Sequence, residues 1–270
     1  MKIISVVNHK GGVGKTTITM NLGAELAERG NKVLLIDLDS QGNLTKATGI
    51  KIRKDNNAVY TIAAALNAVM KGEKINPEDY IYKSEINNNL EVIPCCIDMA
   101  DTKIALNIAM ARETMLKLFI DDIAEVKQYD YILIDNAPSI EVDFQNSLVA
   151  SDEVLIITEA DEFSTDGMES LLNQLAKIKS FFNPRLSVAG VLINKADVRT
   201  NLCKDMIGVI RELFGKLRVF DTVIPASVKL KESQIMKVSI KTYDKENAVA
   251  KAISSFTDEF LEEKQLKSIL

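Results

Sequence analysis

Short apolar runs alternate along the chain with longer amphipathic segments. Six of these runs are nearly continuous in valine, isoleucine and leucine, the pattern of strands whose two faces are both covered. The predicted strands are Ile3–Val7, Val33–Ile36, Leu90–Ile93, Tyr131–Ile134, Val154–Thr158 and Val188–Ile193. Because strands of this kind are typical of parallel sheets, the pattern predicts a sheet that is mostly parallel.

Segments with apolar residues at helical spacing lie between the strands, and most of them stop close to a glycine or proline. Helices are predicted at Thr16–Arg29, Ala58–Met70, Glu141–Ala150, Asp166–Phe181 and Asn201–Phe214. The polar stretches Lys51–Asn57 and Glu85–Asn89 are predicted to be surface loops. This alternation predicts an α/β fold, a twisted parallel sheet with helices on both faces. No linker, repeat or low-complexity tract is found, so residues 1–270 are predicted to form a single domain.

Composition narrows the class of protein. Apolar residues make up 47% and charged residues 26% of the chain, as in ordinary globular proteins. No apolar stretch approaches the roughly 18 residues of a membrane span, and a glycine-lysine loop breaks the first apolar run too early for a secretion signal. The three cysteines, Cys95, Cys96 and Cys203, lack the number and spacing of a disulfide framework or a metal site. We interpret them as structural thiols of a cytoplasmic protein.

Charge is distributed unevenly. The segment from Lys195 to Lys241 holds ten basic and five acidic residues, which makes it +5 on a chain whose net charge is −5. A basic zone on an acidic protein can mark the footprint of a polyanion. Solvated helix faces explain the same charges without any partner, so the zone by itself does not decide the function.

The clearest chemical signal is a glycine-rich run directly after the first predicted strand. Residues 6–17 read VVNHKGGVGKTT, and a predicted helix follows. Strand, glycine loop and helix N-terminus in this order are typical of a phosphate-binding loop, because glycines let successive N–H groups turn toward phosphate oxygens. We expect Lys15 to reach the β- and γ-phosphates, Thr16 to bind Mg²⁺ and Thr17 to bond the α-phosphate. The expected nucleotide-binding residues are Gly11, Gly12, Val13, Gly14, Lys15, Thr16 and Thr17.

Three aspartates come directly after predicted strands, at the edge where open parallel sheets bind ligands. Asp37 and Asp39 lie in LLIDLDSQGN, and Asp135 ends the apolar run of YDYILIDNAPS. One aspartate in such a place is usually a helix cap, but three beside a phosphate loop favour a metal site. We expect Asp135 to hold the water shell of Mg²⁺ and Asp37 to support the ion through water.

The loop departs from the usual G-x-x-x-x-G-K-[ST] pattern, because Asn8 or His9 stands at the first glycine position. Its run KGGVGKTT resembles the deviant phosphate loop of the ParA/MinD ATPases, whose fold is a P-loop NTPase-like three-layer sandwich. The resemblance implies Mg-ATP as the ligand and an ATP-bound homodimer in which the early lysine, Lys10, reaches the partner's nucleotide. It also implies that Asp39 positions the attacking water. Lys10, Lys15 and Asp39 are therefore the expected catalytic residues.

Simple electrostatics agrees with two separate roles for the two lysines. Two ammonium groups from one chain would repel each other on one triphosphate unless the phosphates offset them. A second lysine supplied by the partner couples ATP binding to dimer formation and adds positive charge where phosphoryl transfer needs it.

Adenine recognition is expected from two further segments. Asn194 ends the strand of GVLINKAD and resembles the family's base-contacting asparagine, and Pro225 in VIPASV matches its base-lining loop. Ala226 and Ser227 depart from the I-P-R-N-V that is common there. Glu159, with Ala160 and Asp161 after it, stands where many relatives have P-x-Q-x-E, so contacts across a dimer are not expected from that stretch.

The runs DLDSQGNLT and DVRTNL look closest to ParA/Soj-type DNA-partitioning ATPases. This resemblance implies a nucleoid-associated protein that binds DNA without sequence preference as an ATP dimer and segregates plasmid or chromosomal DNA. It also implies a ParB-type centromere-binding partner that stimulates hydrolysis. Lysines without a base-reading motif imply contacts to the DNA backbone. The DNA-binding candidates are Arg199, Lys204, Arg211, Lys216, Arg218, Lys229, Lys231, Lys237 and Lys241. The phosphate loop begins so close to residue 1 that no N-terminal helix-turn-helix domain is expected.

Other classes stay open. A MinD-like membrane-cycling ATPase needs a basic amphipathic C-terminal helix, whereas SSFTDEFLEEKQLKSIL is acidic before its last two lysines and is predicted to pack on its own domain. We therefore expect no membrane partner. A reductase like the nitrogenase iron protein needs cluster cysteines that Cys95 and Cys96 do not supply. A ligase like dethiobiotin synthetase shares the phosphate loop, but Lys10 and the basic zone count against it.

Overall fold

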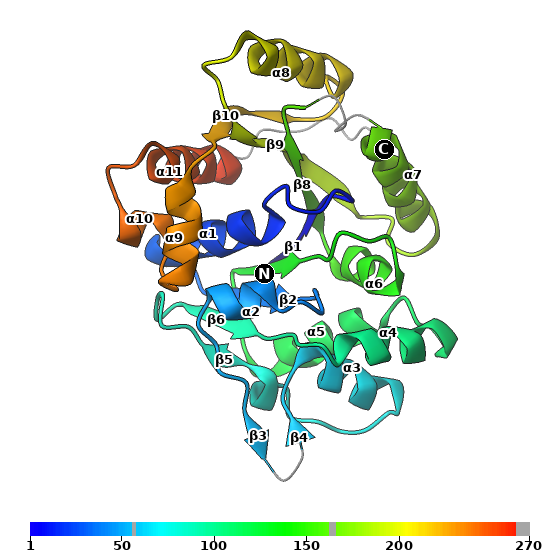
Figure 1. Cartoon of the computed structure of the whole chain (residues 1–270). Helices are drawn as coiled ribbons and strands as arrows, with labels where there is room; N and C mark the ends of the chain where they lie inside the picture. The colour runs from blue at the N-terminus through cyan, green and yellow to red at the C-terminus, as the bar shows by residue number, and fades with distance from the viewer. Residues whose placement is uncertain (56–57, 162–165, 263–270) are drawn as a thin grey trace.

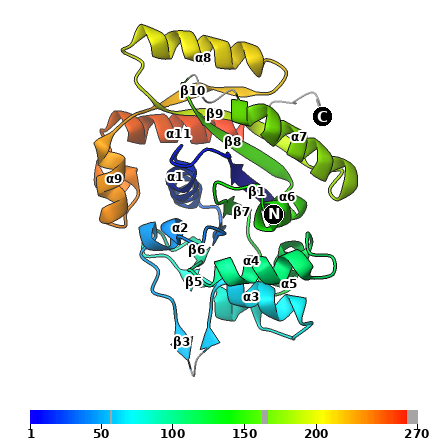
Figure 2. The same ribbon diagram turned by 45° about the vertical axis from the view of Figure 1, so that its right-hand side comes forward.

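Eight strands form one sheet in the computed structural model, which describes residues 1–55, 58–161 and 166–262 (Figure 1). The strand order is β10-β9-β8-β1-β7-β2-β6-β5, and every neighbouring pair is parallel except β5 with β6. The strands are β1 (Lys2–Val7), β2 (Val33–Asp37), β5 (Tyr82–Lys83), β6 (Leu90–Ile93), β7 (Tyr131–Asp135), β8 (Glu153–Glu159), β9 (Ser187–Ala196) and β10 (Val219–Pro225). A separate antiparallel pair, β3 (Lys54–Asp55) and β4 (Ala58–Val59), projects beyond the β5 end of the sheet (Figures 1 and 2).

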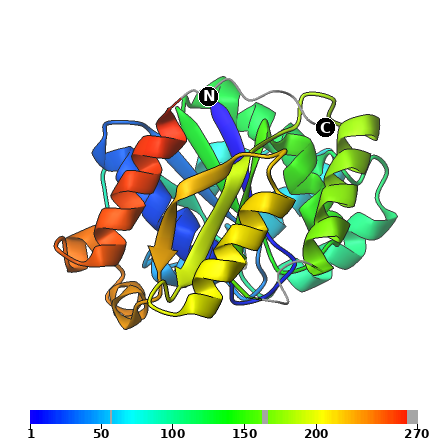
Figure 3. The same ribbon diagram turned by 90° about the horizontal axis from the view of Figure 1, so that it is seen from above.

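Helices cover both faces of this sheet (Figure 3). The first face carries α1 (Lys15–Glu28), α2 (Asn43–Ala47), α9 (Val228–Ile235), α10 (Ile240–Tyr243) and α11 (Ala248–Leu261). The second face carries α3 (Ile62–Met70), α4 (Met99–Ile108), α5 (Met115–Val126), α6 (Val142–Ala150), α7 (Asp166–Phe181) and α8 (Asn201–Leu213), with the short 3₁₀ helix η1 (Pro77–Tyr80). The predicted three-layer α/β sandwich is confirmed. None of the described helices is both long and apolar enough to cross a bilayer.

The period of two in the strands divides the core between the faces. In β1, Ile4 and Val6 pack with the α1 side, whereas Ile3 and Val7 pack with the helices of the opposite side. Because both sets are buried, Ile3–Val7 is an apolar run interrupted only by Ser5, which is why the position of β1 was predictable.

The conformation of Gly14 sets where α1 begins. Gly14 lies immediately before the helix with a φ of +98°, a left-handed conformation that glycine adopts without a steric cost. The helix ends at Glu28, and Gly30 follows with a φ of +89°. The first turn of α1 is therefore aimed at the carboxyl edge of the sheet, beside the ends of β1 and β7.

All six predicted strands are present, but two segments differ from the prediction. The helix predicted over Ala58–Met70 starts only at Ile62, because Ala58–Val59 pairs as β4 and the Thr61 hydroxyl accepts a hydrogen bond from Ala64 N at 3.4 Å as the helix cap. The stretch Lys51–Asn57, predicted as a loop, contains β3, and its last two residues lie outside the described part of the chain.

The C-terminal segment forms α11, which packs on the first face as predicted. Phe256 meets Phe220 edge to face with ring centroids 4.9 Å apart, and Phe260 lies 6.5 Å from the ring of Tyr131. Residues 263–270 of the predicted tail lie outside the described residues.

Candidate functional site

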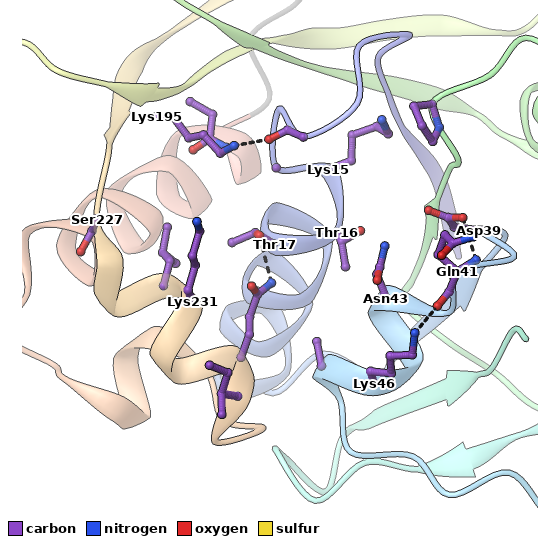
Figure 4. Close-up of a pocket in the computed structure, with 18 of the residues that line it drawn as sticks. Lys15, Thr16, Thr17, Asp39, Gln41, Asn43, Lys46, Lys195, Ser227 and Lys231 are labelled. Atoms are coloured by element: carbon purple, nitrogen blue, oxygen red, sulfur yellow. Dashed lines mark hydrogen bonds between the residues drawn. The ribbon is translucent and has the colours of Figure 1, made fainter.

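A cleft of about 1290 Å³ opens at the carboxyl ends of the central strands (Figure 4). The phosphate loop and the first turn of α1 form its floor, with α2 on one side and α9 on the other. Its polar lining comes from five segments of the chain: Lys15, Thr16, Thr17, Asp39, Gln41, Asn43, Lys46, Asn136, Asn194, Lys195, Ser227, Lys231, Gln234 and Lys237. This is the place where parallel α/β sheets bind ligands.

Lys15 is enclosed by the phosphate loop. Its ammonium donates to the carbonyl oxygens of Asn8 at 3.0 Å and Lys10 at 3.3 Å, and the residue is 6% exposed. Burial lowers the pKa of Lys15, while the charges of Asp135 and Asp39 act against that shift. An anion in the loop would stabilise this desolvated charge, so the geometry fits a phosphate ligand.

The glycines of the loop are required by its conformation. Gly12 and Gly14 have φ values of +80° and +98°, and a Cβ on Gly14 would lie 2.3 Å from Asn194 Nδ2. Both line the cleft. Gly11 and Val13 were predicted with them but are not among the lining residues, and the Val13 side chain is buried in the core. Any contact of these two residues with a nucleotide is limited to their backbone.

Thr16 and Asp135 meet as the predicted metal site requires. The Thr16 hydroxyl donates to Asp135 Oδ2 at 2.6 Å, and Asp135 Oδ1 is buried without a hydrogen-bond partner among the described residues. Burial raises the pKa of Asp135 well above its usual range, and the nearby charge of Asp37 raises it further. A cation would satisfy the orphaned oxygen and remove this penalty.

These residues fit Mg²⁺ better than a metal held by protein alone. No cluster of three or more His, Cys, Asp or Glu side chains suited to a metal occurs among the described residues. Mg²⁺ commonly takes one or two carboxylates and completes its shell with water and substrate phosphates. Thr16 and Asp135 would hold it here, and it would neutralise phosphate charge during transfer.

Asp37 lies opposite Asp135 in the pairing of β2 with β7 and is completely buried. Its carboxylate accepts hydrogen bonds from Thr45 N at 2.9 Å, Thr45 Oγ1 at 2.7 Å and Asp39 N at 3.1 Å. It therefore anchors α2 and the loop that carries Asp39. Its support of the metal through water stays a prediction.

The buried aspartates predict a pH-dependent stability. Burial raises the pKa of Asp37 from 3.8 to about 6. A folded-state pKa above the unfolded one favours folding at low pH, and this contribution, about 3 kcal/mol, is lost as the pH rises through 6. Because the loss runs between the unfolded and folded pKa values, we expect the nucleotide-free protein to lose free energy of unfolding between about pH 4 and pH 7, measured by denaturant titration. Asp37→Asn should reduce that loss, and an identical pH profile in the variant would contradict this assignment.

Asp39 reaches the cleft from the same loop, where it accepts a hydrogen bond from Gln41 N at 2.9 Å (Figure 4). Gln41, Asn43 and Lys46 beside it also line the cleft and were not singled out from the sequence. The only sequence feature that could have indicated these three residues is that they lie in the polar run after Asp39.

Lys10 points elsewhere. It is not among the residues that line the cleft, and its ammonium pairs with Asp161 and lies 3.5 Å from Glu159 Oε2. These carboxylates, the hydrogen bond to Asp161 foremost, raise the pKa of Lys10. The two ammonium groups therefore have different neighbours. That of Lys15 lies inside the loop, and that of Lys10 lies outside it.

The end of β9 packs directly on the phosphate loop. Asn194 Nδ2 donates to Val13 O at 2.7 Å, while Asn194 Oδ1 is buried without a described partner. Lys195, a site residue that the sequence motifs did not indicate, binds the Gly12 carbonyl oxygen and lies 3.1 Å from Glu159 Oε1. Its position next to Asn194 at a strand end was the only signal. Asn194 thus lines the cleft with a free acceptor, as a base contact would need.

Pro225 ends β10 and does not itself line the cleft. The lining passes to the next residues, Ala226, Ser227 and Val228, which lead into α9. The departures from the family pattern at Ala226 and Ser227 therefore fall at the wall of the cleft.

Several DNA-binding candidates have partners inside the molecule. Lys241 lies 2.8 Å from Glu28 Oε2 and 3.1 Å from Glu25 Oε1, and Lys229 pairs with Asp244. The Arg218 guanidinium binds the Glu259 carbonyl oxygen and lies 4.5 Å from the centre of the Phe220 ring. These contacts give the three side chains structural roles, and their contact with DNA stays a prediction.

The remaining six candidates divide into three pairs. Lys231 and Lys237 line the cleft rather than a distant surface. Arg199 makes a bidentate pair with its neighbour Asp197, and Arg211 donates to the Asp221 carbonyl oxygen at 3.1 Å. Lys204 and Lys216 belong to the α8 region and take part in no ion pair among the described residues. Both are exposed, and their contact with DNA stays a prediction.

Comparisons with known proteins agree with this geometry. The model of the family described as AAA domain matches residues 1–188. The sporulation initiation inhibitor protein Soj of Bacillus subtilis is 38% identical over 243 residues, which cover 90% of this chain and 91% of that protein. The chromosome-partitioning ATPase Soj of Treponema pallidum is 34% identical, and the match covers 96% and 97% of the two chains.

The fold has close relatives among solved structures. Cobyrinic acid a,c-diamide synthase of Mycobacterium smegmatis, solved with a bound ATP analog and magnesium, is 26% identical and has a TM-score of 0.79 over 100% of both chains. The deviant loop, the aspartates after β2 and β7 and the near full-length similarity to Soj point to one conclusion. The chain belongs to the ParA/Soj family of P-loop ATPases.

Proposed function

We propose that this protein is a Mg-ATP-dependent dimerising ATPase that binds DNA without sequence preference as the ATP dimer and segregates plasmid or chromosomal DNA. A ParB-type centromere-binding partner stimulates its hydrolysis, and the dimer associates with the nucleoid. Relatives described as a chromosome-partitioning ATPase and a chromosome-partitioning protein support the partitioning role.

The separation of Lys10 from its own cleft carries the dimer proposal. Lys15 already places one ammonium within the loop, while the Lys10 ammonium lies on the other side against the end of β8. The Lys10 side chain is 37% exposed, so a second molecule can approach it. The triphosphate of a partner's ATP carries more negative charge than the two carboxylates that hold Lys10 here. If the Lys10 ammonium left these carboxylates for that triphosphate, dimerisation would depend on bound ATP.

Within one protomer the residues have separate tasks. Lys15 and the loop N–H groups hold the phosphates, and Thr16 with Asp135 holds Mg²⁺. Asp39, fixed by its N–H bond to Asp37, faces the cleft and orients a water for attack. Lys10 of the partner adds the cation that the transition state requires, as an arginine finger does in other NTPases.

The DNA proposal rests on the basic α8 region and is tested by charge reversal. We expect the double variant Lys204→Glu, Lys216→Glu to weaken ATP-dependent DNA binding on all sequences by similar factors, at least about tenfold, since each reversal replaces attraction to a phosphate with repulsion. Filter binding on two unrelated duplexes at several salt concentrations measures this.

The matched control reverses Lys71 and Lys74, which are exposed at the end of α3, far from α8. This control changes net charge equally and should bind DNA much more like the wild type. Loss of binding on only one of the duplexes, or equal loss in both double variants, would contradict backbone recognition by the α8 region.

A further inference from the structure

Helix α9 belongs to the basic segment Lys195–Lys241 and forms one wall of the cleft. Its side chains at Lys231 and Gln234 are three residues apart, so they project from one face of the helix, and both line the cleft. Leu230 and Ser233 on the buried side fix the helix to the body of the molecule. The position of this face toward the cleft is therefore set by packing.

Gln234 acts on a phosphate-loop residue. Its side-chain amide Nε2 donates to the Thr17 hydroxyl at 3.0 Å, across 217 positions of the sequence (Figure 4). A threonine hydroxyl has one proton to donate and two lone pairs that accept. Since Gln234 occupies a lone pair, the Thr17 proton must point to another acceptor. Thr17 lies in the first turn of α1 and lines the cleft, and helix N–H groups at such a turn also converge on an anionic ligand.

Lys231 adds a cation to the same wall. Figure 4 shows its side chain extending from α9 toward the phosphate loop, beside Thr17 and facing Lys195. Neighbouring Lys229 pairs with Asp244, whereas Lys231 takes part in no ion pair among the described residues. An exposed cation at the wall of a cleft, without a counterion among the described residues, is suited to an anionic ligand.

We infer that α9 forms a second phosphate-binding wall of the nucleotide site: Lys231 binds the nucleotide phosphates directly, and Gln234 is a positioning residue that turns the Thr17 hydroxyl toward the α-phosphate. This inference rests on the proposed binding of Mg-ATP in the cleft. It assigns Lys231, which the sequence predicted to bind DNA, to the nucleotide site instead.

A double-mutant cycle tests Gln234 by calorimetric titration with Mg-ATP in the absence of DNA. Gln234→Leu should weaken ATP binding about fivefold to tenfold, since one hydrogen bond to a charged group loses its fixed geometry. In the Thr17→Val background the same change should have almost no further effect. Fully additive losses in the double variant would overturn the positioning role, because Gln234 would then act without Thr17.

Lys231→Met tests the direct contact, with Lys74→Met in the loop after α3 as the matched loss of one exposed lysine. We expect Lys231→Met to weaken binding of ATP and ADP about tenfold and to leave adenosine binding unchanged, while Lys74→Met changes none of these affinities. Wild-type affinity for ATP in Lys231→Met would overturn the inference. Failure of the wild-type protein to bind Mg-ATP would instead refute the proposed function, so the two outcomes are distinct.

Discussion

Replacing Lys10 with alanine should abolish the ATP-dependent dimer while ATP binding to the monomer stays measurable. The ammonium lies outside its own cleft, so its loss leaves Lys15, Thr16 and Asp135 in place. Removing one partner of a buried charge pair across an interface costs about 2–5 kcal/mol, which corresponds to a rise of roughly 30-fold to several thousandfold in the dimer dissociation constant. Sedimentation velocity with a non-hydrolysable ATP analogue measures the dimer dissociation constant.

Asp161→Asn is the matched variant for this test. Asp161 holds Lys10 within the protomer, so weakening that pair should let Lys10 leave more readily and lower the protein concentration at which ATP produces dimers. Dimers of Lys10→Ala that form at the wild-type concentration would show that Lys10 does not join the protomers.

Asp39→Ala should keep ATP binding and dimerisation and lose hydrolysis. General-base and water-orienting groups contribute about 10²–10⁴ in rate, and we expect a fall in kcat of at least about a hundredfold on that basis. The Asp39 carboxylate lies at the cleft but takes part in no described ion pair, so its removal should leave the fold intact. Phosphate release under single-turnover conditions measures the chemical step.

Ser40→Ala provides the control for this variant because Ser40 follows Asp39 in the same loop and does not line the nucleotide cleft. Its rate should stay close to that of the wild type. Turnover of Asp39→Ala at the wild-type rate would exclude Asp39 as the residue that positions water.

Much of the fold could be predicted because the central strands are buried on both sides. In β1, β2 and β7 nearly every residue is apolar, so sequence and structure agree closely. Edge elements gave a weaker signal. The irregular pairing of β10 with β9 leaves Asp221 exposed and Thr222 half-buried, so no continuous apolar run marks this strand. Helix α5 was also missed, although Leu116, Phe119 and Ile123 form a buried helical stripe.

Contacts of the site likewise differ in how well the sequence could predict them. Contacts within one chain segment, such as the loop around Lys15, follow from local sequence rules. Contacts between distant segments do not, because no spacing rule joins Gln234 to Thr17 or Lys195 to the Gly12 carbonyl oxygen. The pairing of Lys10 with Asp161 depends on the parallel register of β1 with β8, which brings the ends of these strands together.

Mixing two inactive variants distinguishes a Lys10 that serves the nucleotide of the partner subunit from one that serves its own. Lys10→Ala keeps Asp39, and Asp39→Ala keeps Lys10, so a mixed dimer assembled on adding ATP contains one complete site only if Lys10 acts across the interface. If Lys10 acts across the interface, each variant alone is inactive and the mixture hydrolyses ATP. A mixture as inactive as its components, although mixed dimers are present, would contradict that role of Lys10.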